Sequence, residues 1–398
     1  MFKRTLTPYL QKIAQQMPIV AILGPRQSGK TTIAKMTWAD YHYVSLEDLD
    51  HRAHATQDPR GFLQQFQDKP GVIIDEFQNV PTLPSYLQTH VDTHQKNGFF
   101  ILTGSQNFLV NQAISQSLAG RVAILSLFPL SLPELKINDI VPSSLKALFF
   151  TGSYPRVYLE KLSPTTWYRD YTLTYLERDV RSLEKVVDLT IFKKFLQLCA
   201  GRVGQLLNIS ALANDCGISQ ATAKGWLSIL EASYLIFLLQ PHFNNFNKRL
   251  VKTPKLYFYD TGLTCSLLGI DSADQLTRHF AFGALMENWV IADLHKQRCH
   301  THQTPHLYFW RDNHGDEIDC IMQTALDLTP IEIKSGQTIA TDFFKGLNKW
   351  NTLADKDPAN SFLVYGGDQN QTRSSGTVLG WQSLDEIWTM IDSRNKQR

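Results

Sequence analysis

Paired cysteines and long apolar runs are both missing from this sequence, and each absence excludes a class of protein. The 398 residues include 5 cysteines, which are widely spaced and form no C-x-x-C pair. Such an odd and scattered set disfavours a disulfide framework and a structural zinc site, and it favours a reducing compartment. No run approaches the roughly 20 apolar residues that span a bilayer, and "YLIFLL" is far too short. We expect a cytoplasmic protein with no membrane role.

The sequence also lacks a strong excess of charge of either sign. Its formal net charge is +2, which is too small to indicate a nucleic-acid partner by itself, so any basic surface must be local. One candidate surface is a basic cluster of Lys248, Arg249, Lys252 and Lys255. An apolar fraction of 43% is ordinary for a globular protein. A chain of this length indicates about two to three domains.

A glycine-rich loop follows an apolar strand near the N-terminus. The run "PIVAIL" precedes a G-x-x-x-x-G-K-[ST] pattern that ends in Lys30 and Thr31, and helix-forming residues come next. In such a loop, backbone N–H groups close around phosphate oxygens at the N-terminus of a helix. Lys30 would meet the β- and γ-phosphates of ATP, and the Thr31 hydroxyl would hold Mg²⁺. The alternative is a strand-to-helix turn that matches by chance. The predicted nucleotide-binding residues are Gly24, Pro25, Arg26, Gln27, Ser28, Gly29, Lys30, Thr31 and Thr32.

Three further strand ends carry candidate catalytic groups. "GVIIDEFQNVP" ends in Asp75, predicted to lie near magnesium, and Glu76, predicted to polarise the attacking water. "FFILTGS" places Thr103 and Ser105 where a γ-phosphate sensor would lie, although Thr-Gly-Ser is also good turn chemistry. Arg121 begins another apolar strand. It either stabilises the transferred phosphate across a subunit boundary or is a solvated strand end.

Five segments together resemble a known family. They are "LGPRQSGKTT", "GVIIDEFQNVP", "ILTGSQNF", "LAGRVAILSLFPLSLPEL" and "GSYPRVY". They resemble the bacterial and archaeal AAA+-type ATPases whose C-terminal half is a domain of unknown function called DUF4143, and the resemblance runs over nearly the whole chain. It implies an ATP-binding α/β core, a winged-helix segment and a C-terminal domain, with ATP and Mg²⁺ as cofactors. The residues matched are Gly24, Gly29, Lys30 and Thr31 for nucleotide, Asp75 and Glu76 for magnesium and water, and the arginines Arg121 and Arg156.

The middle of the chain predicts a helical linker followed by a winged helix. "WYRDYTLTYLERDVRSL" spaces apolar and aromatic residues at helical intervals, as expected for an amphipathic lid or linker. "NISALANDCGISQATAKGWLSILEASYLI" has the spacing of a helix-turn-helix, with Gly217 at the turn and Ser219 as a cap. Two apolar strand runs follow, and the basic cluster would lie on the wing between them.

Three roles remain open for this predicted winged helix. Its second helix would read the major groove of DNA, but it offers only Gln220, Thr222 and Lys224 as polar contacts. Alternatively, the basic cluster on the wing contacts DNA phosphates without sequence preference. The third role is contact with a protein. DNA is the partner that we expect, together with a homo-oligomeric assembly for which a hexamer is one candidate size.

The C-terminal region carries carboxylates on strands and on a helix. "HLYFWRDNHGDEIDCIMQ" predicts two strands joined by a turn, and "TPIEIKSG" predicts a third. Strand alternation puts Glu317 and Asp319 on one face of their strand, and Glu332 and Lys334 on one face of the next. The preceding helix, "FGALMENWVIADLHK", contains Glu287. If the strands pair, these side chains converge.

The order of helix glutamate, strand aspartate and Glu-x-Lys resembles PD-(D/E)XK nucleases, which include Holliday-junction resolvases and restriction-type endonucleases. Ile318 replaces the proline of the motif. The resemblance implies that Asp319 and Glu332 hold a second Mg²⁺ or Mn²⁺, completed or tuned by Glu287, and that Lys334 orients water or stabilises the phosphorane charge. Two other hypotheses stay open: a solvated strand face, and a nuclease-like fold that survives only as a binding scaffold.

The predicted fold class is α/β in several parts. The parts are a P-loop NTPase (AAA+-like) core at 1–165, a helical lid or linker at 166–200, a winged helix-turn-helix at 201–275 and a PD-(D/E)XK nuclease-like α/β domain at 276–398. The predicted function is a magnesium-dependent ATP hydrolase acting on DNA as a binding or remodelling motor. The alternative is a nucleotide-regulated switch whose winged-helix and C-terminal domains bind protein partners. DNA-stimulated ATP hydrolysis would distinguish the two.

Overall fold

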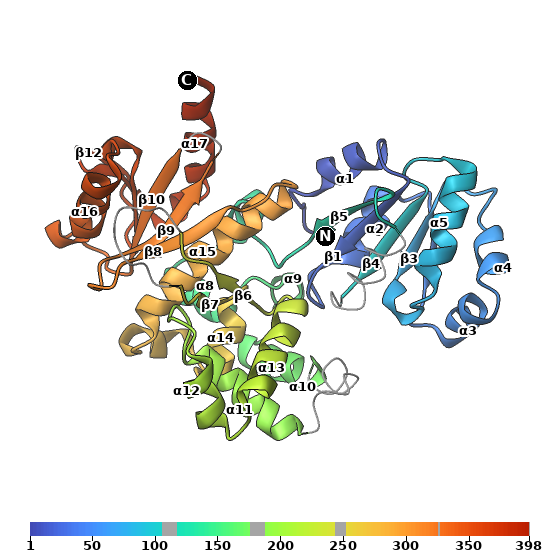
Figure 1. Ribbon diagram of the computed structural model, residues 1–398, viewed down its shortest axis with the longest axis horizontal. Helices are drawn as coiled ribbons and strands as arrows, with labels where there is room; N and C mark the ends of the chain where they lie inside the picture. The colour runs from blue at the N-terminus through green and yellow to red at the C-terminus, as the bar shows by residue number, and fades with distance from the viewer. Residues whose placement is uncertain (106–117, 176–187, 243–251, 325–326, 398) are drawn as a thin grey trace. The chain divides into compact units, whose positions relative to one another are not determined.

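The computed structural model describes residues 1–105, 118–175, 188–242, 252–324 and 327–397 (Figure 1). These residues form two compact units. The first comprises residues 1–130 with the short segments 232–235 and 298–303, and the second comprises the rest. Each unit is described by itself below.

The first unit is built on a parallel sheet of five strands in the order β2-β3-β4-β1-β5 (Figure 1). The strands are β1 (Ile19–Leu23), β2 (His42–Ser45), β3 (Val72–Asp75), β4 (Phe100–Gly104) and β5 (Val122–Ser126). The helices are α1 (Thr7–Ala14), α2 (Lys30–Thr37), α3 (Leu49–Gln57), α4 (Pro59–Gln64), the 3-10 helix η1 (Phe77–Asn79) and α5 (Leu83–His94). All five residues of β1 are buried, as expected for a central parallel strand that is covered on both faces. Leu10 of α1 and Ile33 of α2 pack with the strands in one apolar core.

The second unit begins with a helical region and a pair of strands. Its helices are α7 (Leu132–Ile137), α8 (Leu145–Thr151), α9 (Pro155–Leu159), α10 (Pro164–Tyr175), α11 (Leu189–Ala200), α12 (Ile209–Cys216), α13 (Gln220–Ala232), α14 (Thr261–Leu267), η3 (Ala273–Arg278) and α15 (Phe282–His300). The antiparallel strand pair is β6 (Ile236–Leu239) and β7 (Lys255–Phe258). The predicted turn and cap between α12 and α13 are confirmed: Gly217 ends α12 with φ 76°, and Ser219 Oγ accepts a hydrogen bond of 3.0 Å from the Thr222 amide.

A mixed sheet of six strands, ordered β12-β13-β11-β10-β9-β8, forms the C-terminal part of the second unit. Its strands are β8 (Leu307–Arg311), β9 (Glu317–Gln323), β10 (Leu328–Lys334), β11 (Phe362–Tyr365), β12 (Gln371–Arg373) and β13 (Gly376–Gly380). The helices are η4 (Thr341–Phe344), α16 (Lys345–Ala354), η5 (Pro358–Asn360), η6 (Trp381–Ser383) and α17 (Glu386–Gln397). Leu347 and Trp350 of α16 pack on this sheet in an apolar core.

The register of β9 and β10 decides how the C-terminal carboxylates are arranged. The strands are antiparallel, with Leu328 opposite Gln323 and Ile331 opposite Cys320. The same register continued by one residue puts Glu332 opposite Asp319, and directly opposed residues project to the same face. Helix α15 contacts β7, where Asn288 bonds to both backbone groups of Phe258, and η6, where Trp289 packs near Trp381.

The unit boundary differs from the boundary predicted at residue 165. The long N-terminal segment of the first unit ends at Leu130. Residues 131–165 belong to the second unit, where α8 packs against α14 and η3. In the described part of the chain, each helix is too short or too polar to cross a membrane.

Candidate functional site

The phosphate loop joins β1 to α2 and depends on glycine at two positions. A Cβ atom on Gly24 would collide with the carbonyl oxygen of Leu127, so no larger residue fits there. Gly29 starts α2 with φ 96°, a backbone conformation that residues with a side chain rarely adopt. The loop and helix therefore form as the sequence predicts, with the amide groups of the loop at a helix N-terminus.

Two cations hold this loop from within the first unit. The buried Lys30 ammonium donates to the carbonyl oxygens of Gly24, at 3.0 Å, and Pro25, at 2.8 Å. Arg4 donates to the Ser28 carbonyl at 2.7 Å and to the Phe128 carbonyl at 2.6 Å. No sequence pattern indicated Arg4, because it lies 24 residues before Ser28 in a segment without a motif.

Thr31 and Asp75 meet beside the loop, as a magnesium site requires. The Thr31 hydroxyl donates to Asp75 Oδ1 at 2.9 Å, and the Thr103 hydroxyl donates to the same oxygen. Tyr43, which sequence reasoning missed, donates to Asp75 Oδ2 at 2.9 Å. Burial and the Asp75 carboxylate raise the pKa of Tyr43 to about 12, so the phenol stays protonated and remains a donor at neutral pH. A hydroxyl and a carboxylate at this position are suitable oxygen ligands for Mg²⁺.

Glu76 lies one residue beyond β3 in a conformation that is unusual for glutamate. Its φ of 53° is left-handed, which turns the side chain away from the strand. Oε2 accepts hydrogen bonds from Ser105 Oγ, at 3.0 Å, and from the Gln78 amide. Among the described residues, Oε1 accepts none. Glu76 and Ser105, which the sequence assigned to separate roles, are therefore in contact, and Gln78 is a partner that the sequence did not indicate.

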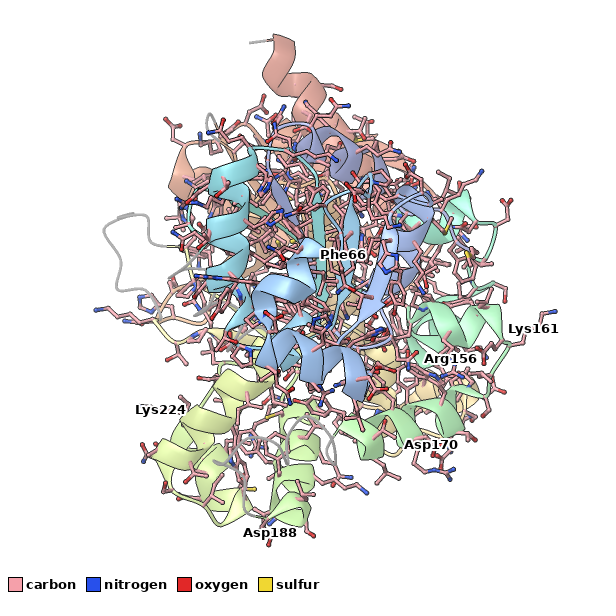
Figure 2. All side chains as sticks on the ribbon, turned by 90° about the vertical axis from the view of Figure 1, so that its right-hand side faces the viewer. Phe66, Arg156, Lys161, Asp170, Asp188 and Lys224 are labelled. Atoms are coloured by element: carbon pink, nitrogen blue, oxygen red, sulfur yellow. The ribbon has the colours of Figure 1, made fainter. Side chains whose placement is uncertain are left out.

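Arg121 and Arg156, the two candidate arginines, are each engaged in an ion pair, and Arg156 belongs to the second unit. Arg121 precedes β5 and makes a two-point ion pair with Asp92, at 2.6 and 2.9 Å. Because β1 and β5 are parallel, Arg121 lies at the opposite edge of the sheet from Gly24. Arg156 pairs with Glu160 on the exposed surface of α9 (Figure 2). A role across a subunit boundary stays a prediction for either arginine.

The basic cluster predicted for the wing separates in the structure. Lys248 and Arg249 lie outside the described residues, and Lys252 is exposed. The prediction that Lys255 lies on the wing surface is wrong, because this residue is in β7 and its side chain is only 3% exposed. Strand alternation within a buried pair directs its ammonium inward, toward carboxylates rather than solvent. Lys224 of α13, by contrast, lies on the surface (Figure 2).

The C-terminal carboxylates converge as predicted. Glu287 of α15 and Glu317 and Asp319 of β9 each have an oxygen within 4.8 Å of the others. Glu332 of β10 is outside this group of three but lies opposite Asp319 in the register described above, and its Oε1 accepts a 2.5 Å hydrogen bond from Lys334. Together we call Glu287, Glu317, Asp319 and Glu332 the carboxylate cluster. Glu317 is the member that the sequence placed nearby without assigning it a role.

Burial and mutual repulsion control the charge of this cluster. Burial is the main reason that the pKa of Asp319 is raised well above its ordinary value. The negative charges of Glu332 and Glu287 raise this pKa further. Burial also raises the pKa of Glu332, against the opposing effect of Lys334. Burial lowers the pKa of Lys255, but Glu287, Glu317 and Asp319 outweigh burial and raise it. The cluster therefore favours a bound cation.

The donor set of the carboxylate cluster fits a hard divalent cation. Carboxylate oxygens are the ligands that Mg²⁺ and Mn²⁺ prefer. Glu332 Oε2 is buried and has no hydrogen-bond partner among the described residues, which leaves one oxygen available inside the protein. Asp319 Oδ2 accepts from the Ile333 amide at 2.8 Å, so its orientation is fixed by the backbone of β10.

Comparison with known proteins divides the chain into three matched regions. Residues 16–136 match an AAA domain, residues 142–274 match a domain of unknown function (DUF8612), and residues 282–384 match another (DUF4143). The chain carries a P-loop ATPase domain of the AAA type. This agrees with the parallel sheet and the phosphate loop. The C-terminal match has no assigned activity, so it gives no role to the carboxylate cluster.

Two relatives that match most of this chain are described as uncharacterized proteins. An uncharacterized protein of Mycobacterium tuberculosis is 28% identical over 400 residues, covering 98% of this chain and 87% of the relative. One from Haemophilus influenzae is 26% identical over 417 residues, covering 94% and 97%. Among solved structures, the Walker-type ATPase PABY2304 of Pyrococcus abyssi has a TM-score of 0.45 at 13% identity, covering 67% of this chain and 96% of that one. The RuvB Holliday junction branch migration motor of Thermotoga maritima has a TM-score of 0.28 at 19% identity, covering 58% and 86%.

Proposed function

We propose that this chain is a magnesium-dependent ATP hydrolase that uses ATP turnover to act on DNA. The observation that carries the proposal is the contact between Thr31 and Asp75 at the base of the phosphate loop, next to a Glu76 that is already oriented by two donors. Phosphoryl transfer needs positioning and charge stabilisation more than covalent chemistry, and this arrangement supplies both.

Each side chain has a defined part in this proposal. The loop amides and Lys30 bind the phosphates, and Lys30 places a positive charge where the transferred phosphate develops negative charge. Thr31 and Asp75 would hold Mg²⁺, which neutralises phosphate charge when bound. Glu76 orients and polarises the attacking water through Oε1, while Ser105 and Gln78 fix the carboxylate through Oε2.

Action on DNA is inferred from the middle region. Helices α12 and α13 followed by the β6–β7 pair have the order of elements of a winged helix. Lys224 on α13 and Lys252 before β7 are both exposed and available for phosphate contacts. Such contacts give binding that depends on salt rather than on sequence. We also propose self-assembly, because Arg121 lies at the opposite end of the sheet from the phosphate loop and could stabilise a transferred phosphate only on a neighbouring copy.

The proposal is tested by measuring ATP hydrolysis with and without Mg²⁺, and with single-stranded, duplex and branched DNA. We expect hydrolysis to require Mg²⁺ and to be faster with DNA, with a stimulation that declines as salt rises. A rate of ATP hydrolysis that does not change with any of these DNAs would refute the proposed action on DNA and favour the nucleotide-regulated switch. Absence of Mg²⁺-dependent hydrolysis in all conditions would refute the enzyme itself.

A second candidate activity is metal-dependent cleavage of a phosphodiester bond at the carboxylate cluster. It is favoured by the convergence of Glu287, Glu317 and Asp319, and by the buried Oε2 of Glu332 on the neighbouring strand, which has no hydrogen-bond partner among the described residues. A divalent cation held there would activate water for attack on phosphorus. Lys334, about one-third exposed at 33%, would stabilise the charge that develops on the phosphate.

Replacing Asp319 with asparagine is expected to abolish cleavage of plasmid or branched DNA in Mn²⁺ and to leave ATP hydrolysis unchanged. The reason is that the substitution removes a central ligand of the carboxylate cluster, while the phosphate loop belongs to a different compact unit. The control is Asp316→Glu, since Asp316 pairs with Lys349 outside the cluster. Cleavage that survives in Asp319→Asn would contradict this role.

A further inference from the structure

The carboxylate cluster contains a cation that belongs to the chain itself. Lys255 Nζ lies 2.8 Å from Glu287 Oε1 and is ion-paired with Glu317 Oε1. Those two glutamates are two of the three residues whose oxygens lie within 4.8 Å of one another. The ammonium therefore contacts the same carboxylates that would hold a divalent cation.

The position of Lys255 is set by the strand that carries it. Lys255 and Tyr257 are two residues apart in β7, so their side chains project to the same face. Tyr257 donates to Glu287 Oε1 at 2.5 Å, the same oxygen that receives Lys255. The backbone of β7 is held by its pairing with β6, with Leu239 opposite Lys255. The two donors thus reach α15 from a strand of the middle region, not from the C-terminal sheet.

Lys334 does not replace Lys255 in this arrangement. It bonds Glu332 Oε1 and is 33% exposed, whereas Lys255 is 3% exposed. Glu332 is itself only 7% exposed, and its Oε2 has no hydrogen-bond partner among the described residues. One side of the cluster is therefore neutralised by Lys255, while the Glu332 side keeps an oxygen available for another cation.

We propose that the Lys255 ammonium occupies the place of a metal ion in the carboxylate cluster. A divalent cation then binds there tightly only when Lys255 moves away or is replaced. An ammonium and a divalent ion compete for Glu287 and Glu317 because both need the same oxygens and both carry positive charge. The proposal rests on the proposed cleavage function for its consequence, which is that the β6–β7 pair controls metal loading. It places regulation of the C-terminal site in the middle region.

The test is Mn²⁺ binding to the full chain without nucleotide, measured by electron paramagnetic resonance and calorimetry. We expect Lys255→Met to bind one Mn²⁺ about tenfold or more tightly than the parent, because a competing positive charge is gone. The combined variant Lys255→Met with Asp319→Asn should lose that gain. Lys193→Met, which removes an exposed lysine of α11, should bind Mn²⁺ like the parent. An unchanged affinity in Lys255→Met, or a gain that survives Asp319→Asn, would overturn the proposal.

Thermal unfolding shows whether Lys255→Met is folded. Lys255→Met leaves Glu287 and Glu317 without their ammonium, so we expect it to be less stable than the parent and to regain stability in Mn²⁺. If Lys255→Met does not fold even with Mn²⁺, the Mn²⁺ affinity of the parent protein tests the proposal instead. Parent binding with a dissociation constant below about 100 µM, lost in Asp319→Asn, would overturn the proposal, and weaker binding would support it.

DNA cleavage separates this inference from the function on which it rests. Tight Mn²⁺ binding by Lys255→Met without cleavage of any DNA would refute the nuclease role and leave the role of Lys255 intact. Cleavage by the parent at micromolar Mn²⁺, equal to that of Lys255→Met, would refute the role of Lys255 and leave the nuclease role intact.

Discussion

Glu76→Gln is expected to leave ATP binding intact and to slow turnover by about 10²- to 10⁴-fold, the usual contribution of a positioned general base. Glutamine keeps the size of the side chain and can still accept from Ser105 and Gln78. It cannot accept a proton from water, because an amide is not a base. The measurement is kcat for ATP under saturating Mg²⁺, with nucleotide affinity measured separately by fluorescence or calorimetry.

Two variants make the Glu76 result specific. Asp68→Asn removes an exposed carboxylate of the first unit and should leave kcat unchanged. Ser105→Ala removes the 3.0 Å hydrogen bond to Oε2 and should lower kcat by less than Glu76→Gln does. A Glu76→Gln protein with the kcat of the parent would show that another group polarises the water.

Lys30→Ala is expected to remove most ATP binding. A hydrogen bond to a charged group contributes about 1.5–3 kcal/mol, so losing it should weaken binding roughly 10- to 150-fold, with a larger loss in kcat/KM. The ammonium is buried against the loop carbonyls of Gly24 and Pro25, where no other described lysine takes its place. Calorimetry with a slowly hydrolysed ATP analogue measures the affinity directly.

The control for this variant is Lys12→Ala, because Lys12 is an exposed lysine of α1 in the same unit. It should bind and hydrolyse ATP like the parent. Circular dichroism should show that Lys30→Ala is folded, since the hydrogen bonds of Lys30 to Gly24 and Pro25 hold the loop and not the strands of the sheet. Equal ATP affinity in Lys30→Ala and the parent would contradict the assignment of this loop as the nucleotide site.

The nucleotide site could be predicted because its chemistry is local in sequence. Gly24, Gly29, Lys30 and Thr31 lie within one loop and the first turn of a helix, so a single segment fixes their relative positions. Asp75 follows because parallel strands place their carboxyl ends at one edge of a sheet. The partners of these residues were not predictable in the same way. Arg4, Tyr43 and Gln78 have no motif, and only packing brings them to Ser28, Asp75 and Glu76.

The C-terminal site shows the same division between pattern and packing. Strand alternation alone placed Glu332 and Lys334 on one face, and the antiparallel register then brought Asp319 opposite Glu332. The sequence assigned Lys255 to a solvated wing because it follows three other basic residues. In the structure, β7 instead carries it inward to Glu287 and Glu317.

By itself the sequence determined the phosphate loop, the two acidic strand ends and the alternation of carboxylates along β9 and β10, since each depends on residues a few positions apart. Only the tertiary structure decided which basic side chain forms an ion pair with which carboxylate. The ammonium of Lys255 reaches Glu287 across 32 positions of the chain. Such a pairing depends on how one strand packs beside a helix, and the energy of the buried pair depends on the solvent that packing excludes.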